Sequence, residues 1–202
     1  MGSSATVHII GVINDTPYLA GKNGSEPGKA LLRVNRKPEN IVGTRTHDVF
    51  NLTAWSRWAQ VLVGLKKGDC VAVVGNLETF QLGQGAGAKY GTQVKVNSIE
   101  KLMVAAEHEA YAHLIGYLAG DHSGISRLAV HRIKKDVGRY TDFLLFESDD
   151  PRLDELKLGS NIYVRGRLQS ETVQSQGGTW HQALTVADAP LLVLGKKQEV
   201  GE

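Results

Sequence analysis

The sequence predicts an all-β protein that consists of two tandem copies of one five-stranded barrel. Two observations lead to this prediction. The chain repeats itself at an interval of about 90 to 105 residues, and each copy consists of short apolar runs that are separated by turn residues. A length of 202 residues suits either one large domain or two of roughly 100 residues. The repeat decides in favour of two.

The internal repeat runs through most of the chain. Segment 8–12 returns as 113–117 at an offset of 105, and segment 65–69 returns as 156–160 at an offset of 91. The offset shrinks in steps that fall in Gly-, Ser- and Asp-rich stretches, as expected when loops differ in length and strands are kept. The other matching segments are 32–36 with 128–132, 47–50 with 141–144, 75–77 with 166–168 and 94–96 with 184–186.

Ten strands follow from the alternation of apolar and polar residues. Between the third and fourth strand of each copy, segments 56–65 and 149–158 have room for a helix. Five strands with a helix in that place is the order of the OB fold. We therefore predict OB domains over 1–104 and 105–202, joined near 104–109, where a polar stretch interrupts the strand pattern. The predicted strands are 6–13, 30–36, 48–55, 70–80 and 90–103, then 111–118, 125–132, 140–147, 161–173 and 180–194.

The composition is typical of a soluble, turn-rich globular protein, with 42% hydrophobic and 22% charged residues and 23 glycines against 5 prolines. No apolar run approaches the roughly 20 residues that a membrane helix needs. Residues 1–4 lack the charged and apolar regions of a signal peptide. We therefore expect a cytoplasmic protein that does not bind membranes.

The net charge of +2 is unevenly distributed. Residues 1–104 contain 12 Lys and Arg against 7 Asp and Glu, whereas residues 105–202 contain 11 against 14. The N-terminal half therefore carries a net charge of +5 and the C-terminal half −3. The N-terminal half is the better candidate for a surface that binds a polyanion.

Five segments of the first copy occur in an order and at a spacing that are typical of one protein family. They are His8-Ile9-Ile10-Gly11, Val34-Asn35-Arg36, Trp55-Ser56-Arg57-Trp58-Ala59, Leu65-Lys66-Lys67-Gly68-Asp69 and Val71-Ala72-Val73-Val74-Gly75-Asn76-Leu77. Together they resemble bacterial-type single-stranded DNA-binding proteins. The resemblance covers most of 6–103 and, more weakly, 111–194.

This resemblance implies a protein that coats and protects single-stranded DNA in replication, recombination or repair, associated with the nucleoid and without a cofactor. Family members with one OB domain per chain typically assemble four domains, so a two-domain chain is expected to form a homodimer. Replication and repair proteins are further partners of the family, often recruited by an acidic C-terminal tail. Here the chain stops at 195–202 without such a tail.

Aromatic side chains on the outside of a barrel can stack on unpaired bases. Because side chains alternate along a strand, Phe50, Leu52 and Ala54 of segment 48–55 are expected to face the core. Val49 and Trp55 then lie on the outer side. The family carries stacking aromatics at both positions, so the resemblance implies that Trp55 is a base platform; a packing role is the alternative. Val49 departs from the family pattern. The equivalents in the second copy are Phe143 and the acidic segment 148–150.

Binding that tolerates any base sequence also needs basic groups that lie along the phosphate backbone. We expect electrostatic capture by such groups and then stacking of bases on the aromatics, with a merely solvated charged face as the alternative. The aromatic candidates are Trp55, Phe80, Tyr90, Tyr140, Phe143 and Trp180. The polar and basic candidates are Arg33, Asn35, Arg36, Lys37, Arg57, Lys89, Lys95, Arg132, Lys134, Lys135 and Arg139.

Three near-motifs of enzymes fail on spacing or context. Segment 108–113 has its second histidine one position too far for a zinc-binding helix, and segment 24–30 is one residue short of a phosphate-binding loop. The glycines of 83–87 precede no helix pattern, which excludes the dinucleotide motif. We therefore expect no catalytic residues and no metal site. An OB pair that serves as a protein-interaction or assembly factor, and binding of RNA rather than DNA, remain open alternatives.

Overall fold

The computed structural model describes residues 3–21, 26–41, 43–82, 89–122, 125–134, 138–175 and 178–195. The chain divides into two compact units. The N unit consists of Val7–Ala110 and Gln169–Ala183, and the C unit consists of Met1–Thr6, Tyr111–Leu168 and Leu184–Glu202. The predicted domain boundary at residue 104 stays a prediction, because a segment from the second half of the chain is grouped with the first.

The N unit is built on a closed five-stranded barrel. Its strands are paired in the order β1-β5-β6-β4-β3, and β3 pairs with β1 to close the ring. The pairing of β4 with β6 is parallel, whereas β3 with β4 and β5 with β6 are antiparallel. The strands are β1 (Ser4–Ile13), β2 (Tyr18–Leu19), β3 (Gly28–Asn35), β4 (His47–Ala54), β5 (Cys70–Leu82) and β6 (Lys89–Lys101).

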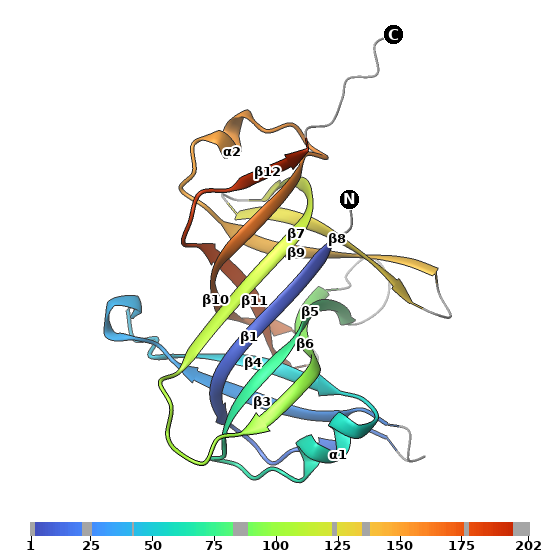
Figure 1. Ribbon diagram of the computed structural model, residues 1–202, viewed down its shortest axis with the longest axis vertical. Coiled ribbons are helices and arrows are strands. Elements are labelled where there is room, and N and C mark those ends of the chain that lie inside the picture. The colour runs from blue at the N-terminus through green and yellow to red at the C-terminus, as the bar shows by residue number, and fades with distance from the viewer. Residues whose placement is uncertain are drawn as a thin grey trace. The chain divides into compact units, whose positions relative to one another are not determined.

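The core of the N unit follows the predicted alternation. Phe50, Leu52 and Ala54 on β4 are all buried, as are Leu32 and Val34 on β3. Helix α1 (Arg57–Val63), at the lower right of Figure 1, lies between β4 and β5 in sequence. It packs on β3, and its residues Ala59 and Leu62 are buried. A one-turn 3-10 helix, η1 (Pro38–Asn40), follows β3.

The C unit has the same topology. Its strands are paired in the order β7-β8-β9-β11-β10, and β10 pairs with β7 to close the ring. The pairing of β9 with β11 is parallel, as at the equivalent place in the N unit. The elements are β7 (Glu109–His122), β8 (Ile125–Lys134), β9 (Gly138–Glu147), α2 (Arg152–Glu155), β10 (Asn161–Ser175), β11 (Gly178–Ala187) and β12 (Leu192–Gly195).

The fold class predicted from the sequence, two tandem OB barrels with a short helix after the third strand of each, is confirmed. Nine of the ten predicted strands are present as single elements, and the short strand β2 was not predicted. The predicted strand 180–194 is wrong as one element, because β11 ends at Ala187 and β12 begins at Leu192. Pro190, which has no N–H to donate to a ladder, lies in the break.

Equivalent glycines allow close strand contacts in both barrels. A Cβ atom added at Gly11 would lie 2.5 Å from the carbonyl oxygen of Arg33, and one at Gly116 would lie 2.6 Å from that of Ala129. Only glycine fits at such a distance. The repeat of the sequence thus reflects one barrel geometry that is used twice. Within the described part of the chain, no helix is long and apolar enough to cross a membrane.

Candidate nucleic-acid interface

The outer face of β4 is partly covered by the hairpin segment 169–183, the part of β10 and β11 that belongs to the N unit. The backbone N–H of Val49 donates a hydrogen bond of 2.8 Å to Oγ of Ser170. The side-chain amide of Asn51 donates to the carbonyl oxygens of Thr92 (2.9 Å) and His181 (3.2 Å). Val49 is therefore only half-exposed, which gives a structural reason for the missing aromatic at this position.

Arg36 and Arg132, equivalent in the repeat, form equivalent ion pairs. Arg36 donates two hydrogen bonds to the carboxylate of Asp48, at 2.9 and 2.7 Å, and both side chains are only 5% exposed. Arg132 binds Asp142 in the same bidentate manner. A guanidinium that is paired inside a barrel has little left to offer a phosphate. These pairs indicate a structural task, and phosphate contact by the two arginines stays a prediction.

Exposed aromatic rings lie on both barrels. Trp55, Tyr90 and Phe143 are 47%, 54% and 51% exposed. Trp55 follows the last residue of β4 and precedes Ser56, which has a φ angle of 52°. This left-handed turn ends the strand and begins α1, so the side chain of Trp55 stands at the rim of the barrel and not in the core.

Two further predicted aromatics have neighbours. Phe80 and Trp180 meet edge to face with ring centroids 5.7 Å apart, both within the N unit. In the C unit, the guanidinium of Arg132 lies 4.7 Å from the ring centroid of Tyr140. The edge-to-face pair is half-buried, so one ring supports the other while part of each stays accessible.

The predicted basic residues differ in how far they are already paired. Lys37 forms an exposed ion pair of 2.7 Å with Glu107, which holds the pKa of that carboxyl below its usual value. Lys95 lies 3.9 Å from Glu78 and is 45% exposed. Arg57 lies over the ring of Trp58, 4.5 Å from its centroid. Of these contacts, the ion pair of Lys37 with Glu107 is exposed on both sides and is therefore weak.

The other predicted polar residues lie on the same outer side of β3 or in the C unit. Arg33 is half-buried, and its Nε atom has no hydrogen-bond partner. Asn35 is exposed, and its backbone N–H donates to Nδ1 of His108 at 2.9 Å. Burial and the nearby charge of Arg33 lower the pKa of His108. Arg139 is exposed at the start of β9. Lys135 lies outside the described residues, as do the side chains of Lys89 and Lys134.

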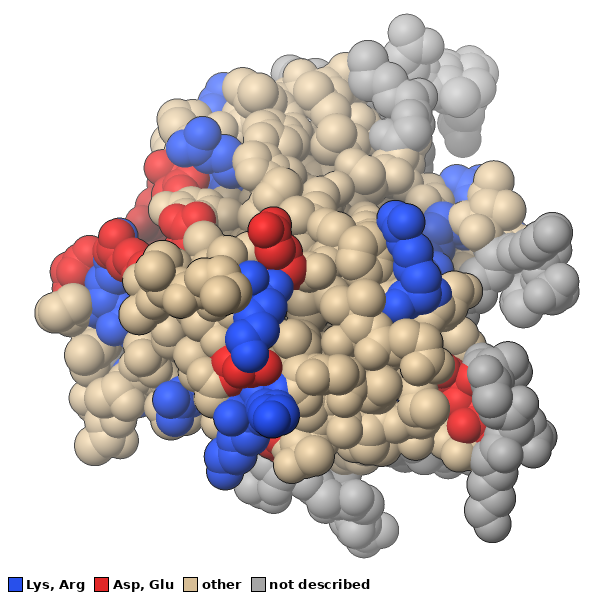
Figure 2. Space-filling view, turned by 60° about the horizontal axis from the view of Figure 1, so that its bottom comes forward, with Lys and Arg blue, Asp and Glu red and all other residues tan. Residues whose placement is uncertain are grey.

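The charge pattern of the surface is mixed. On the face that Figure 2 shows, blue basic side chains stand among red acidic ones and wide uncharged areas. Among the described residues on that face, basic groups are thus interspersed and do not merge into one continuous stripe. Binding there would depend on individual contacts more than on a strong general field.

Sequence reasoning missed several residues beside the predicted ones. Strand β2 pairs Tyr18, which is 54% exposed, with Lys29 on β3, and Lys29 pairs in turn with Thr53 on β4. The exposed ring of Tyr18 and the half-exposed side chain of Lys29 therefore lie on strands that neighbour the end of β4. A two-residue strand is too short to give a periodic signal, and only the turn residues around it could have pointed to it.

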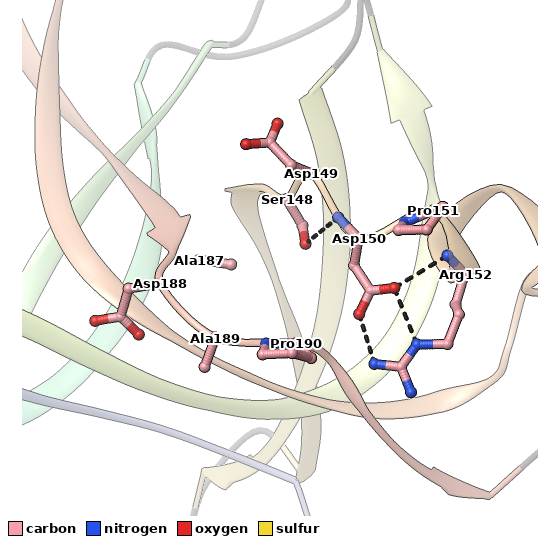
Figure 3. Close-up of a pocket in the computed structure, with 9 residues that line it drawn as sticks. All are labelled: Ser148, Asp149, Asp150, Pro151, Arg152, Ala187, Asp188, Ala189 and Pro190. Atoms are coloured by element: carbon pink, nitrogen blue, oxygen red, sulfur yellow. Dashed lines mark hydrogen bonds and ion pairs between the residues drawn. The ribbon is translucent and has the colours of Figure 1, made fainter.

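A hollow of about 740 Å³ lies in the C unit at the place equivalent to the Trp55 region. Figure 3 shows how Asp150 points to Arg152, with which it forms a pair of hydrogen bonds of 2.9 and 2.6 Å. This contact holds the pKa of Asp150 far below its usual value. The hollow also carries Asp149 and Asp188, so it is a poor place for a phosphate. The described residues hold no group of His, Cys, Asp and Glu arranged for a metal ion.

Comparison with solved structures places the chain among OB-barrel pairs. It matches the crystal structure of the wild-type single-stranded DNA-binding protein from Thermus aquaticus with a TM-score of 0.71 and 19% identity, over 100% of this chain and 98% of that one. A deletion mutant of that protein matches with a TM-score of 0.67 and 18% identity, over 100% and 99%. No family model and no curated protein matches the sequence. The fold implied by the sequence resemblance is thus the fold of solved proteins that bear the family's name.

Proposed function

We propose that the protein binds single-stranded DNA without sequence preference and has no catalytic activity. The observation that carries the proposal is the set of exposed rings on two OB barrels, Trp55, Tyr90 and Phe143, each about half exposed. Exposed tryptophan and tyrosine rings are enriched at binding surfaces, where they offer a large apolar face and a polar group. The likeness in fold to the single-stranded DNA-binding protein from Thermus aquaticus, over the whole chain, supports it.

The mechanism that we propose has two parts. Exposed or weakly paired basic side chains, such as Arg139 and Lys95, attract the phosphates. Unstacked bases then lie on the exposed rings, at roughly 1 to 3 kcal/mol per base. Because every base has a flat face, this mode tolerates any sequence. In the cell the protein would coat single strands in replication, recombination or repair, in the cytoplasm at the nucleoid.

The test is a fluorescence titration with oligo(dT) of several lengths, at low and high salt, beside a duplex control. The chain contains three tryptophans, and stacking of bases quenches their emission. We expect quenching that saturates, weakens with salt and is absent with duplex DNA. Oligo(U) in the same titration distinguishes DNA from RNA, since stacking surfaces accept either backbone.

A protein-interaction or assembly factor is the second candidate. It is favoured by the β4 face, where Val49 is bonded to Ser170 of the hairpin segment, and by the acidic hollow around Asp149. Absence of any quenching at low salt would favour this second function over DNA binding.

A further inference from the structure

The hairpin segment 169–183 is attached to the N unit along both of its strands. On β10, the backbone N–H of Ser170 donates to Oδ1 of Asp48 at 2.8 Å, while Oγ of Ser170 accepts from the N–H of Val49. On β11, the backbone N–H of Ala183 donates to Oγ1 of Thr92 at 2.6 Å. Each bond joins residues more than 90 positions apart in the chain, so the attachment belongs to tertiary structure.

The attachment is buried and closely packed. Ser170 is 1% exposed, Ala183 is 3% and Thr92 is 4%. The gap among Val49, Asn51, Thr92, His181 and their neighbours leaves no room for a water molecule. Buried hydrogen bonds in a dry contact hold one geometry, because each polar group left without its partner would be costly. The described ends of the hairpin segment are thus held in the N unit at Ser170 and Ala183.

Trp180 lies between these attachment points. It follows Ser170 by ten residues on the return strand and precedes His181, whose carbonyl oxygen accepts from Asn51. Its ring meets Phe80 of β5 edge to face. By register, Phe80 lies opposite Gly91, on the same face of the hairpin β5–β6 as Lys95. The hairpin segment therefore brings a ring from the second copy to Phe80, on the face of the first barrel that also carries Lys95.

We propose that Phe80 and Trp180 form one base-stacking platform shared by the two copies, and that Ser170 and Thr92 are positioning residues for its tryptophan. The proposal rests on the function proposed above and specifies one of its contact sites. The two copies then contribute to a common site, and neither copy has the complete site alone.

The experiment is a double-mutant cycle. We expect Trp180→Ala to weaken oligo(dT) binding about tenfold, as the loss of one stacked base does. The pair Ser170→Ala with Thr92→Val should weaken it several-fold, and no further in the Trp180→Ala background, because these residues act only through the ring. Thr92→Ser, which keeps the accepting oxygen, should restore binding. Losses that simply add in the cycle would overturn the proposal.

Emission from Trp180 gives a measurement that is independent of DNA. With Trp55 and Trp58 changed to Phe, the Ser170→Ala and Thr92→Val pair should shift the emission to the red, because a released ring is more exposed to water. The matched control is Thr185→Val on the same strand, whose buried Oγ1 has no hydrogen-bond partner. We expect it to change neither emission nor binding.

The binding measurement and the emission measurement separate the proposed function from the positioning role of Ser170 and Thr92. If the unmodified protein does not bind oligo(dT), the proposed function fails, while the emission arm still decides whether Ser170 and Thr92 position Trp180. If the protein binds and the emission does not move, the positioning role is refuted and the function stands.

Discussion

At the level of single residues, two basic side chains of the N unit, Arg36 and Lys95, have different surroundings. Arg36 makes a close, bidentate contact to the carboxylate of Asp48 and is only 5% exposed, whereas Lys95 is 45% exposed and lies 3.9 Å from the carboxylate of Glu78. Both are cations in the same barrel. Their surroundings decide which of them can bind an external phosphate without loss of an internal partner.

This difference can be measured by the salt dependence of binding. We expect Lys95→Ala to lower the slope of log K against log salt by about 0.7, the contribution of one phosphate contact on a single strand. Arg36→Ala should leave the slope unchanged and lower the melting temperature, because an unpaired buried Asp48 costs about 3 to 5 kcal/mol. The reverse pattern, in which Arg36→Ala changes the slope in a stable protein, would show that Arg36 reaches the DNA.

Trp55 is the exposed ring for which the sequence left two tasks open. If Trp55 is a base platform, Trp55→Ala should weaken the binding of labelled oligo(dT) by about 1 to 3 kcal/mol, as measured by fluorescence anisotropy. The melting temperature should change little, because the side chain is 47% exposed. Trp55→Phe should retain most of the affinity.

The control for Trp55 is Leu158→Ala in the C unit, which removes a side chain that is 61% exposed and carries no ring. Its affinity for oligo(dT) should equal that of the unmodified protein. A Trp55→Ala variant with normal affinity and reduced stability would instead establish the packing role.

At the scale of the secondary-structure elements, His181 makes the attachment of the hairpin segment 169–183 a candidate for pH dependence. His181 has a buried Nδ1 without a partner, and burial, followed by the charges of Arg45 and His47, lowers its pKa. Above pH 6.5 the ring is neutral in both the folded and the unfolded chain. Below that pH the unfolded chain takes up the proton first, so stability falls until the lower pKa of the folded state is reached.

We therefore expect the melting temperature to fall between pH 7 and pH 5, and to fall less in His181→Gln. The variant removes only part of the effect, because burial also lowers the pKa of His108 and His131 in the same direction. If the melting temperature falls equally with pH in both proteins, His181 is not the group that titrates. Thermal melting followed by circular dichroism is sufficient for this comparison.

The elements also show what a sequence can and cannot predict. The barrels were predictable because strands 6–13 and 111–118 and their successors repeat a local pattern, and local patterns determine strands. The Arg36–Asp48 pair left a signal as well, since both residues recur as Arg132 and Asp142. The contact of Ser170 with Asp48, 122 positions away, has no local signal. No periodicity indicates which surface a hairpin will cover.

On the scale of the whole molecule, the proposed function raises the question of how many barrels would bind one strand. Each OB fold covers roughly 4 to 16 nucleotides, so one chain would cover about 8 to 32 if both copies bind. The shared platform of Phe80 and Trp180 and the exposed Phe143 of the C unit favour use of both copies. The acidic hollow at Asp149 limits the contribution of the C unit at one end.

Stoichiometric titration at low salt with oligo(dT) of increasing length, combined with light scattering, answers this question. The resemblance leads us to expect a homodimer, with a mass of twice the 21.9 kDa of one chain, and a site size per chain larger than one OB fold can cover. Phe143→Ala should then reduce the site size without abolishing binding, because the contacts of the N unit remain. A site of fewer than about 16 nucleotides per chain, unchanged in Phe143→Ala, would mean that the strand is held by the N unit and its hairpin alone, and that the second barrel serves chiefly to carry that hairpin.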